Sequence, residues 1–161
     1  MNKNYLNRFE GRSVLITGHT GFIGSWLAII LNELGANVIG YALSPYTAED
    51  NYVVTHLEDK VTSIIGDIRD YNNVKKIFEN YKPEIVYHLA AQPIVRKSYA
   101  IPKETFDINV GGTINIFEAF RKSKKIYYTF CLEIGIFLPS AFSKLPIVIN
   151  PVFVKVPSLE R

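Results

Sequence analysis

The sequence predicts an α/β fold with a doubly wound parallel sheet in one domain of ordinary size. Apolar runs of strand length alternate with segments of helical periodicity, and these runs are apolar throughout, as expected for strands covered on both faces. Three glycines at intervals of three stand between the first apolar run and the first helical segment. The chain has 161 residues, which is enough to bury a substantial core in a single domain.

Strands and helices follow one another along the first 125 residues. The helical segments place apolar residues at intervals of three and four, whereas the strand segments are continuously apolar. The predicted strands cover 13–18, 37–43, 61–67 and 84–90, and the predicted helices cover 22–34, 74–81 and 104–124. We expect the strand order 3-2-1-4, and the segment IYYTF (126–130) fits a fifth strand.

The first predicted helix has a wide apolar stripe, which we expect to be buried against the sheet. Gly35 then ends this helix in a left-handed conformation. Before the next helix, Asp67 or Asp70 can accept hydrogen bonds from free amide groups, and Pro83 separates that helix from the following strand. The stripe consists of Phe22, Ile23, Trp26, Leu27, Ile30, Leu31 and Leu34.

The composition argues against several classes of function. The 18 basic and 15 acidic residues are scattered, so the net charge of +3 indicates neither a nucleic-acid partner nor an anionic membrane. Cys131 is the single cysteine, which excludes an internal disulfide and fits a reducing cytoplasm. No apolar run suits a secretion signal or a membrane span, and no metal-binding constellation is present in the sequence.

The character of the chain changes near Ile126. Four prolines punctuate the apolar residues that follow, which excludes a long helix and fits poorly with central strands. We therefore divide the chain into a dinucleotide-binding domain, 1–125, and an atypical apolar, proline-rich tail, 126–161. Our hypothesis for the tail is a reading-frame change or a truncation.

The three glycines indicate a phosphate-binding turn. In the stretch TGHTGFIG, Gly18 permits a tight turn, Gly21 lets the backbone approach a pyrophosphate, and Gly24 allows the helix to pack closely on the strand. Strand, turn, helix and second strand together span the roughly 30 residues that such a unit needs. The alternative interpretation is a glycine-rich turn that binds nothing.

Four blocks of sequence, in this order, resemble the extended short-chain dehydrogenase/reductase family, whose members act on nucleotide sugars. The blocks are GHTGFIGSWL (18–27), GDIRD (66–70), PEIVYHLAAQPIVRKSY (83–99) and NVGGTINIFEA (109–119). They are most similar to the nucleotide-sugar 4,6-dehydratases that use CDP-glucose, except at Ile23, where that subgroup usually has a basic residue. The resemblance extends from Gly11 to Lys125 and implies a Rossmann-like NAD-binding domain, truncated relative to the family.

The resemblance also implies roles for particular residues. Gly18, Gly21, Phe22, Ile23 and Gly24 would form the pyrophosphate loop. Asp67 and Ile68 would meet the adenine, with a helix cap as the alternative role of Asp67. Leu89, Ala90 and Ala91 would line the nicotinamide side. Asn109, in the helix that follows, would also bind the cofactor, with a simple surface position as its alternative. Residues of the segment 92–99, namely Gln92, Arg96, Ser98 and Tyr99, would border the hexose.

The cofactor preference is not readable from charge. An acidic residue is expected about 20 positions beyond the glycines to bind the adenosine ribose of NAD, but the second strand ends GYALSP, without a carboxylate and without an arginine for a 2′-phosphate. NAD is therefore implied by the resemblance alone.

The family chemistry requires residues that this sequence does not show in the expected place. Such dehydratases oxidise the C4 hydroxyl of the sugar by hydride transfer to NAD, eliminate water across C5 and C6, and return the hydride to C6, with a tyrosine base assisted by the lysine of a Tyr-x-x-x-Lys pair. The matches at Tyr71 and Lys75 and at Tyr99 and Lys103 are badly placed for that role. We therefore assign no catalytic residue and expect the chain to be inactive, with a stand-alone NAD-binding or regulatory module, or a remnant that binds nothing, as alternatives. A homodimer through the 104–124 helix is a further expectation from the family.

Overall fold

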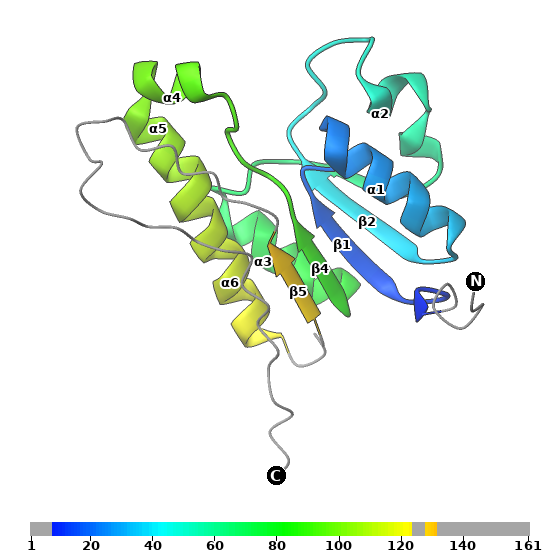
Figure 1. Ribbon diagram of the computed structural model, residues 1–161. Helices are drawn as coiled ribbons and strands as arrows, with labels where there is room; N and C mark the ends of the chain where they lie inside the picture. Colours follow the sequence, from blue (N-terminus) through cyan, green and yellow to red (C-terminus); the bar gives the residue numbers. More distant parts are fainter. Residues whose placement is uncertain (1–7, 124–127, 132–161) are drawn as a thin grey trace.

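The computed structural model describes residues 8–123 and 128–131, and these form a three-layer α/β arrangement (Figure 1). The strands are β1 (Ser13–Thr17), β2 (Asn37–Ala42), β3 (Thr62–Ile65), β4 (Ile85–His88) and β5 (Tyr128–Cys131). The helices are α1 (Phe22–Glu33), α2 (Asn51–Val54), η2 (Leu57–Asp59), α3 (Tyr71–Tyr81), α4 (Val95–Ala100), α5 (Pro102–Phe106), the π-helical turn η3 (Asp107–Gly112) and α6 (Thr113–Lys122).

The sheet is parallel throughout, in the order β3-β2-β1-β4-β5. The predicted order 3-2-1-4, with a fifth strand beyond it, is confirmed. The tail prediction for 126–161 lies outside the described residues except for β5, which corresponds to part of IYYTF. The crossovers run outward from β1 through β2 and β3, and in the other direction from β4 to β5. The order therefore reverses between β1 and β4, which is the place where ligands bind in folds of this kind.

Both faces of the sheet are buried, as the continuously apolar strands predict. Along β1, Val14 and Ile16 belong to the core that contains Ala28 and Leu31 of α1, whereas Leu15 belongs to the opposite core. That second core includes residues of α3 and α6, among them Val74, Ile77, Phe78, Ile116 and Phe120. The central strand is therefore the common wall of two cores.

The prediction that the whole apolar stripe of α1 packs on the sheet is confirmed only for Leu31, which is buried, and Leu27, which packs against the same core. Phe22 is 75% exposed and Ile30 is 52% exposed, and the buried residues of this helix are Gly24, Ser25, Ala28 and Leu31. Phe22 and Ile30 lie two positions from the buried Gly24 and Ala28, and residues two positions apart on a helix point about 200° apart. The side chains of Phe22 and Ile30 therefore face away from the sheet. The helix adopts this orientation because its first turn packs directly on the backbone of Gly18, and only small residues fit there.

The boundaries of the helices follow recognisable residues. Gly35, at φ +78°, follows the end of α1 as predicted, and its amide donates to the carbonyl of Asn32. Asp70 caps α3, accepting from the amides of Asn72 and Asn73. The predicted 104–124 helix is three helical segments, α5, η3 and α6, because the backbone passes through a π-helical turn at Asp107–Gly112.

Candidate functional site

The candidate site lies at the carboxyl edge of the sheet, where the loop after β1 meets the loop after β4. The amide of Gly18 donates to the carbonyl of Tyr41 in β2, over 2.9 Å, and the chain then turns, with the amide of Gly21 donating back to the carbonyl of Gly18 over 3.1 Å. Gly18 has φ +80°, and a Cβ there would lie 2.9 Å from the amide nitrogen of Ala90. A side chain at this position would separate the two loops, which explains why the first residue of the motif is glycine.

Gly24 and Gly21 lack a side chain for different structural reasons. A Cβ on Gly24 would lie 2.1 Å from the carbonyl oxygen of Gly18, so this glycine permits the close packing of α1. Gly21, the residue before α1, has φ −75° and ψ 168°, which any residue can adopt, and a Cβ there would be 3.3 Å from the same oxygen. Gly21 is exposed, and no side chain caps the amides of the first turn of α1. The helix start is therefore a surface of backbone N–H groups and positive dipole, suited to an anion.

His19 lies beneath this loop and is buried. Its Nε2 is 2.7 Å from the Oγ of Ser63, and its ring meets the ring of Tyr52 edge-on at 5.3 Å between centroids. Gly40 leaves the space that the imidazole fills. Burial lowers the pKa of His19 to about 4, so the ring is neutral at physiological pH. Of the two ring nitrogens, Nε2 has this hydrogen-bond partner, whereas Nδ1 has none among the described residues.

Asp67 lies just beyond β3 and is engaged by Arg69. The Arg69 amide donates to Oδ1 at 2.8 Å, and its guanidinium donates to both carboxylate oxygens. The Arg69 guanidinium holds the pKa of Asp67 below its usual value. The helix-cap interpretation of Asp67 is wrong, because Asp70 caps α3. An adenine amine at Asp67 would share an acceptor that is already paired, while the buried Ile68 fixes this loop against Gly112.

Asn109 is 2% exposed, so the alternative of a surface polar residue is wrong. Its side chain bonds both backbone groups of Gln92: Oδ1 accepts from the amide at 2.7 Å, and Nδ2 donates to the carbonyl at 3.2 Å. Asn109 therefore supports the loop after β4 from the π-helical turn. Leu89, Ala90 and Ala91 lie in this loop between β4 and Gln92, next to Gly18.

The residues expected at the hexose divide into buried and exposed pairs. Gln92 is buried, where its amide bonds the backbone of Ile94 and the hydroxyl of Thr105. Ser98 is buried in α4, with its hydroxyl donating to the carbonyl of Val95. Arg96 and Tyr99, on the same helix, are exposed. The structure thus presents Arg96 and Tyr99 to solvent, and gives Gln92 and Ser98 internal bonds.

Both Tyr-x-x-x-Lys matches make other contacts. Lys75 pairs with Glu79 at 3.6 Å, and the Tyr71 hydroxyl accepts from Lys122 at 3.1 Å. Tyr99 and Lys103 lie on different helices, and Lys103 pairs with Asp107.

Among the buried polar residues that sequence reasoning missed are Thr17, His88 and Thr113. The signal was present, since Thr17 and His88 are polar residues at the ends of otherwise apolar strands. Their hydrogen bonds converge on the loop after β4.

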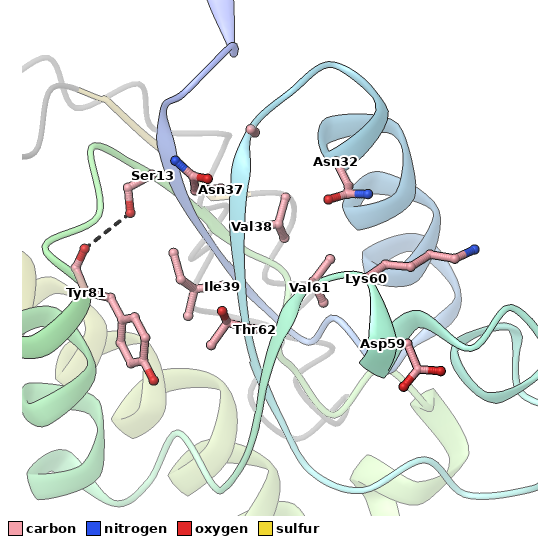
Figure 2. Close-up of a pocket in the computed structure, with 11 residues that line it drawn as sticks. Ser13, Asn32, Asn37, Val38, Ile39, Asp59, Lys60, Val61, Thr62 and Tyr81 are labelled. Carbon is pink, nitrogen blue, oxygen red and sulfur yellow. Dashed lines mark hydrogen bonds between the residues drawn. The ribbon is translucent and has the colours of Figure 1, made fainter.

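A hollow of about 420 Å³ lies at the opposite edge of the sheet, at the amino ends of the strands (Figure 2). Ser13, Asn37 and Thr62, the first residues of β1, β2 and β3, line it together with Lys60. In Figure 2, the Ser13 hydroxyl points to the carbonyl of Tyr81, to which it donates at 3.2 Å. The hollow is separate from the glycine loop, which follows the other end of β1.

Two absences apply to the described part of the chain alone. None of its helices is long and apolar enough to cross a membrane. Within the same residues, no three or more histidine, cysteine, aspartate or glutamate side chains gather as metal ligands would.

The parallel sheet, the switch point between β1 and β4, and the glycine turn at the start of α1 define a Rossmann-like domain of the class that holds dinucleotides. The family model described as GDP-mannose 4,6 dehydratase matches residues 15–131. The chain belongs to this family of nucleotide-sugar dehydratases and epimerases.

Relatives of known activity share the same region. CDP-glucose 4,6-dehydratase of Salmonella typhimurium is 47% identical over 116 residues, which are 72% of this chain and 32% of that protein. CDP-paratose 2-epimerase of Salmonella typhi is 38% identical over 110 residues, which are 68% of this chain and 32% of the epimerase. The chain spans about a third of the length of these relatives.

Solved structures of epimerases share this fold. UDP-glucose 4-epimerase from Brucella ovis, in complex with NAD, superposes with a TM-score of 0.62 at 28% identity, covering 71% of this chain and 34% of that one. The enzyme from Thermus thermophilus, also an NAD complex, gives a TM-score of 0.60 at 31% identity, covering 70% of this chain and 34% of that one.

Proposed function

We propose that this chain is the NAD-binding part of a nucleotide-sugar 4,6-dehydratase whose substrate is CDP-glucose. The observation that carries the proposal is the cradle at Gly18, Gly21 and Gly24, because a Cβ at Gly18 or Gly24 would meet backbone and the exposed turn at Gly21 faces solvent. The same cradle is the test of whether NAD fits. Close backbone approach and free amide groups at a helix start are what a pyrophosphate requires.

The residues would divide the cofactor between them. The backbone from Gly18 to Gly24 would hold the pyrophosphate, and the loop at Asp67 and Ile68 would meet the adenine. Leu89, Ala90 and Ala91 would lie along the nicotinamide half. When bound, NAD supplies the acceptor for a hydride from the sugar, while the chain's own contribution is to bind and orient the cofactor.

NAD is proposed over NADP from the relatives rather than from charge. The described end of β2 offers neither a carboxylate for a ribose nor an arginine for a 2′-phosphate at Ala42 and Leu43. Structures of related epimerases hold NAD, which supports the same cofactor here.

The CDP-glucose assignment is supported by the relative from Salmonella typhimurium, together with the exposed Arg96 and Tyr99, which are available to a nucleotide sugar. We propose that this chain by itself does not turn over the sugar, because neither Tyr-x-x-x-Lys match is arranged as a base and its assisting lysine. The second candidate is a binding module without catalysis, which the same observation favours. A homodimer through 104–124 is proposed from the family, and Ile114, which is exposed on α6, lies on the segment concerned.

Calorimetric titration of the full chain with NAD, and separately with NADP, tests the cofactor assignment. We expect NAD to bind more tightly. A second assay incubates the chain with NAD and CDP-glucose and measures the 4-keto sugar; no product together with NAD binding is the expected result. Product formation would overturn the proposed inactivity, and the absence of binding by either dinucleotide would overturn the cofactor assignment.

A further inference from the structure

A chain of buried hydrogen bonds connects the two loops of the candidate site to α6. The Oγ1 of Thr17, at the end of β1, lies 2.6 Å from Nδ1 of His88 at the end of β4. The other ring nitrogen of His88, Nε2, lies 2.9 Å from Oγ1 of Thr113, which is 2.6 Å from the carbonyl oxygen of Asn109. At the first end, the amides of Leu89 and Ala90 both donate to Thr17 Oγ1, each at 3.2 Å.

The direction of donation along this chain follows from its last member. A carbonyl oxygen only accepts, so the hydroxyl proton of Thr113 is committed to Asn109. Thr113 Oγ1 must then accept from His88, which places a proton on Nε2. Burial lowers the pKa of His88 to about 4, so the ring is neutral and Nδ1 is a bare acceptor. The Thr17 hydroxyl therefore donates to Nδ1.

With the proton of His88 on Nε2, every hydrogen-bonding group along this chain has a partner. The proton of Thr17 is directed at His88, so its oxygen lone pairs face the amides of Leu89 and Ala90. In the opposite tautomer, Thr17 Oγ1 would receive a third donor, and a lone pair of His88 would face an oxygen of Thr113 that has no proton to give. Because a buried polar group without a partner loses its hydration and gains nothing in return, one tautomer is strongly favoured.

We propose that Thr17, His88 and Thr113 are positioning residues, forming a relay of fixed direction that holds the backbone of Leu89 and Ala90 in the shape required by the nicotinamide half of the cofactor. The inference rests on the proposed NAD site. It concerns three residues that are absent from those assigned to cofactor or sugar; Thr17 bonds the loop directly, and His88 and Thr113 act through Thr17.

Two features show why the relay acts on this loop in particular. The amide of Ala90 lies at the position that a Cβ on Gly18 would crowd, so the relay governs the distance between the two loops of the site. Asn109, which ends the relay with its carbonyl, also bonds both backbone groups of Gln92. The segment 89–92 is thus held at its start by Thr17 and at its end by Asn109. The π-helical turn that presents Asn109 is a feature common at functional sites.

The test uses Thr113→Val, which keeps the shape of the side chain and removes the hydroxyl, with Thr113→Ser as the matched control that retains the hydroxyl. Nitrogen-15 NMR of the histidine rings reports the tautomer of His88, and His19→Gln and His56→Gln identify the other two signals. Titrations with NAD and with ADP separate the whole cofactor from the half that the relay does not reach.

We expect His88 to carry its proton on Nε2 in the wild type and in Thr113→Ser. In Thr113→Val, we expect the Nδ1–H tautomer to gain population and NAD affinity to fall roughly tenfold, because one buried donor loses its acceptor. ADP affinity should stay within about twofold of the wild type, because ADP lacks the nicotinamide half.

Three results would overturn the relay: a wild-type His88 protonated on Nδ1, equal NAD affinity in Thr113→Val and Thr113→Ser, or parallel losses of NAD and ADP binding with a falling Tm, which would show a purely structural role. The wild-type tautomer is measured without Thr113→Val, so poor folding of that variant leaves the test in place. If the wild type binds ADP but not NAD, or neither, the proposed function fails, and the tautomer still decides whether the relay exists.

Discussion

The three glycines after β1 have three different neighbours. Gly18 turns with positive φ and Gly24 packs against the carbonyl of Gly18, so both shape the fold. Gly21 has an ordinary extended conformation and faces solvent, so its missing side chain matters to whatever approaches from outside. Only at Gly21 can ligand binding be separated from folding by substitution.

We therefore predict that Gly21→Ala weakens NAD binding by roughly tenfold or more, or about 1.4 kcal/mol, because a methyl group would stand where the pyrophosphate approaches. Its stability should change by less than about 1 kcal/mol, since the new Cβ meets only the Gly18 oxygen at 3.3 Å. Calorimetric titration and urea unfolding measure the two effects.

Gly111→Ala is the matched control, because a Cβ there meets nothing within 4 Å. Its NAD affinity should equal that of the wild type. Unaltered NAD affinity in Gly21→Ala would contradict the assignment of the pyrophosphate loop.

The two buried histidines predict how stability depends on pH. Burial lowers the pKa of His19 and of His88 to about 4, whereas the unfolded chain binds these protons near pH 6.5. The stability that this difference provides is complete above about pH 6.5 and is lost as the pH falls toward 4. Each histidine should contribute a slope of at most about 1.4 kcal/mol per pH unit in this window.

Urea unfolding between about pH 5 and pH 6.5 measures this slope above the range where most carboxylates titrate. His88→Gln should reduce it by the share of one histidine. An identical slope in His88→Gln and the wild type would show that His88 is not buried in its neutral form.

At the level of single residues, the sequence identified positions better than partners. Asp67 and Asp70 are equivalent candidates for a cap in the sequence, and only the geometry shows that Asp70 caps α3 while Asp67 pairs with Arg69. In the sequence, Asn109 looks like a surface residue on a helix, because the residues around it give no sign of its hydrogen-bond partner, Gln92, 17 positions away. Such contacts depend on tertiary structure, which no spacing in the sequence records.

Helix α3 begins with a side-chain cap from Asp70. Asp70 accepts from the amides of Asn72 and Asn73, which would otherwise lack partners at the helix start. We predict that Asp70→Ala lowers the free energy of unfolding by about 1 kcal/mol, and that Asp70→Asn retains most of it. Chemical denaturation of the two variants provides the comparison, and equal losses in both would contradict a capping role.

The adjacent glycines before α6, Gly111 and Gly112, are not equivalent in the structure. A Cβ on Gly112 would lie 2.4 Å from Cδ1 of Ile68, whereas one on Gly111 meets nothing. We predict that Gly112→Ala destabilises the protein by about 1–2 kcal/mol, the cost of overpacking less the gain in helix propensity, and that Gly111→Ala is neutral or stabilising by up to about 1 kcal/mol.

A double-mutant cycle with Ile68→Ala identifies the contact. The pair Gly112→Ala and Ile68→Ala should be less destabilising than the sum of the single changes, because the truncated side chain makes room for the new methyl group. Strict additivity in urea unfolding would show that Gly112 is constrained by something other than Ile68.

The elements themselves were predicted well where their period was clear. The four strands and the helices around 22–34 and 74–81 follow from apolar pattern and from Gly35, Asp70 and Pro83. The short helices α2 and α4 were missed, because four to six residues give too little periodicity to recognise. The face of α1 was predicted only in part: Leu31 is buried as expected, but hydrophobicity also favoured large side chains such as Phe22, whereas packing on Gly18 requires small ones.

For the whole molecule, the order of the strands explains why the chemistry gathers at one edge. The crossovers diverge between β1 and β4, so the loops that follow these two strands meet at the carboxyl edge (Figure 1). The hollow at Lys60 and Thr62 lies at the other edge, formed by the amino ends of strands (Figure 2). The two edges are far enough apart in the fold to be told apart by residue-specific measurement.

If NAD binds at the carboxyl edge, backbone amide NMR during an NAD titration should show it there. We predict shifts at Gly18, Gly21 and Gly24, at Ile68 and along 89–92, with the amides of Lys60 and Thr62 unchanged. Shifts confined to Lys60, Thr62 and their neighbours, or no shifts at saturating NAD, would contradict it.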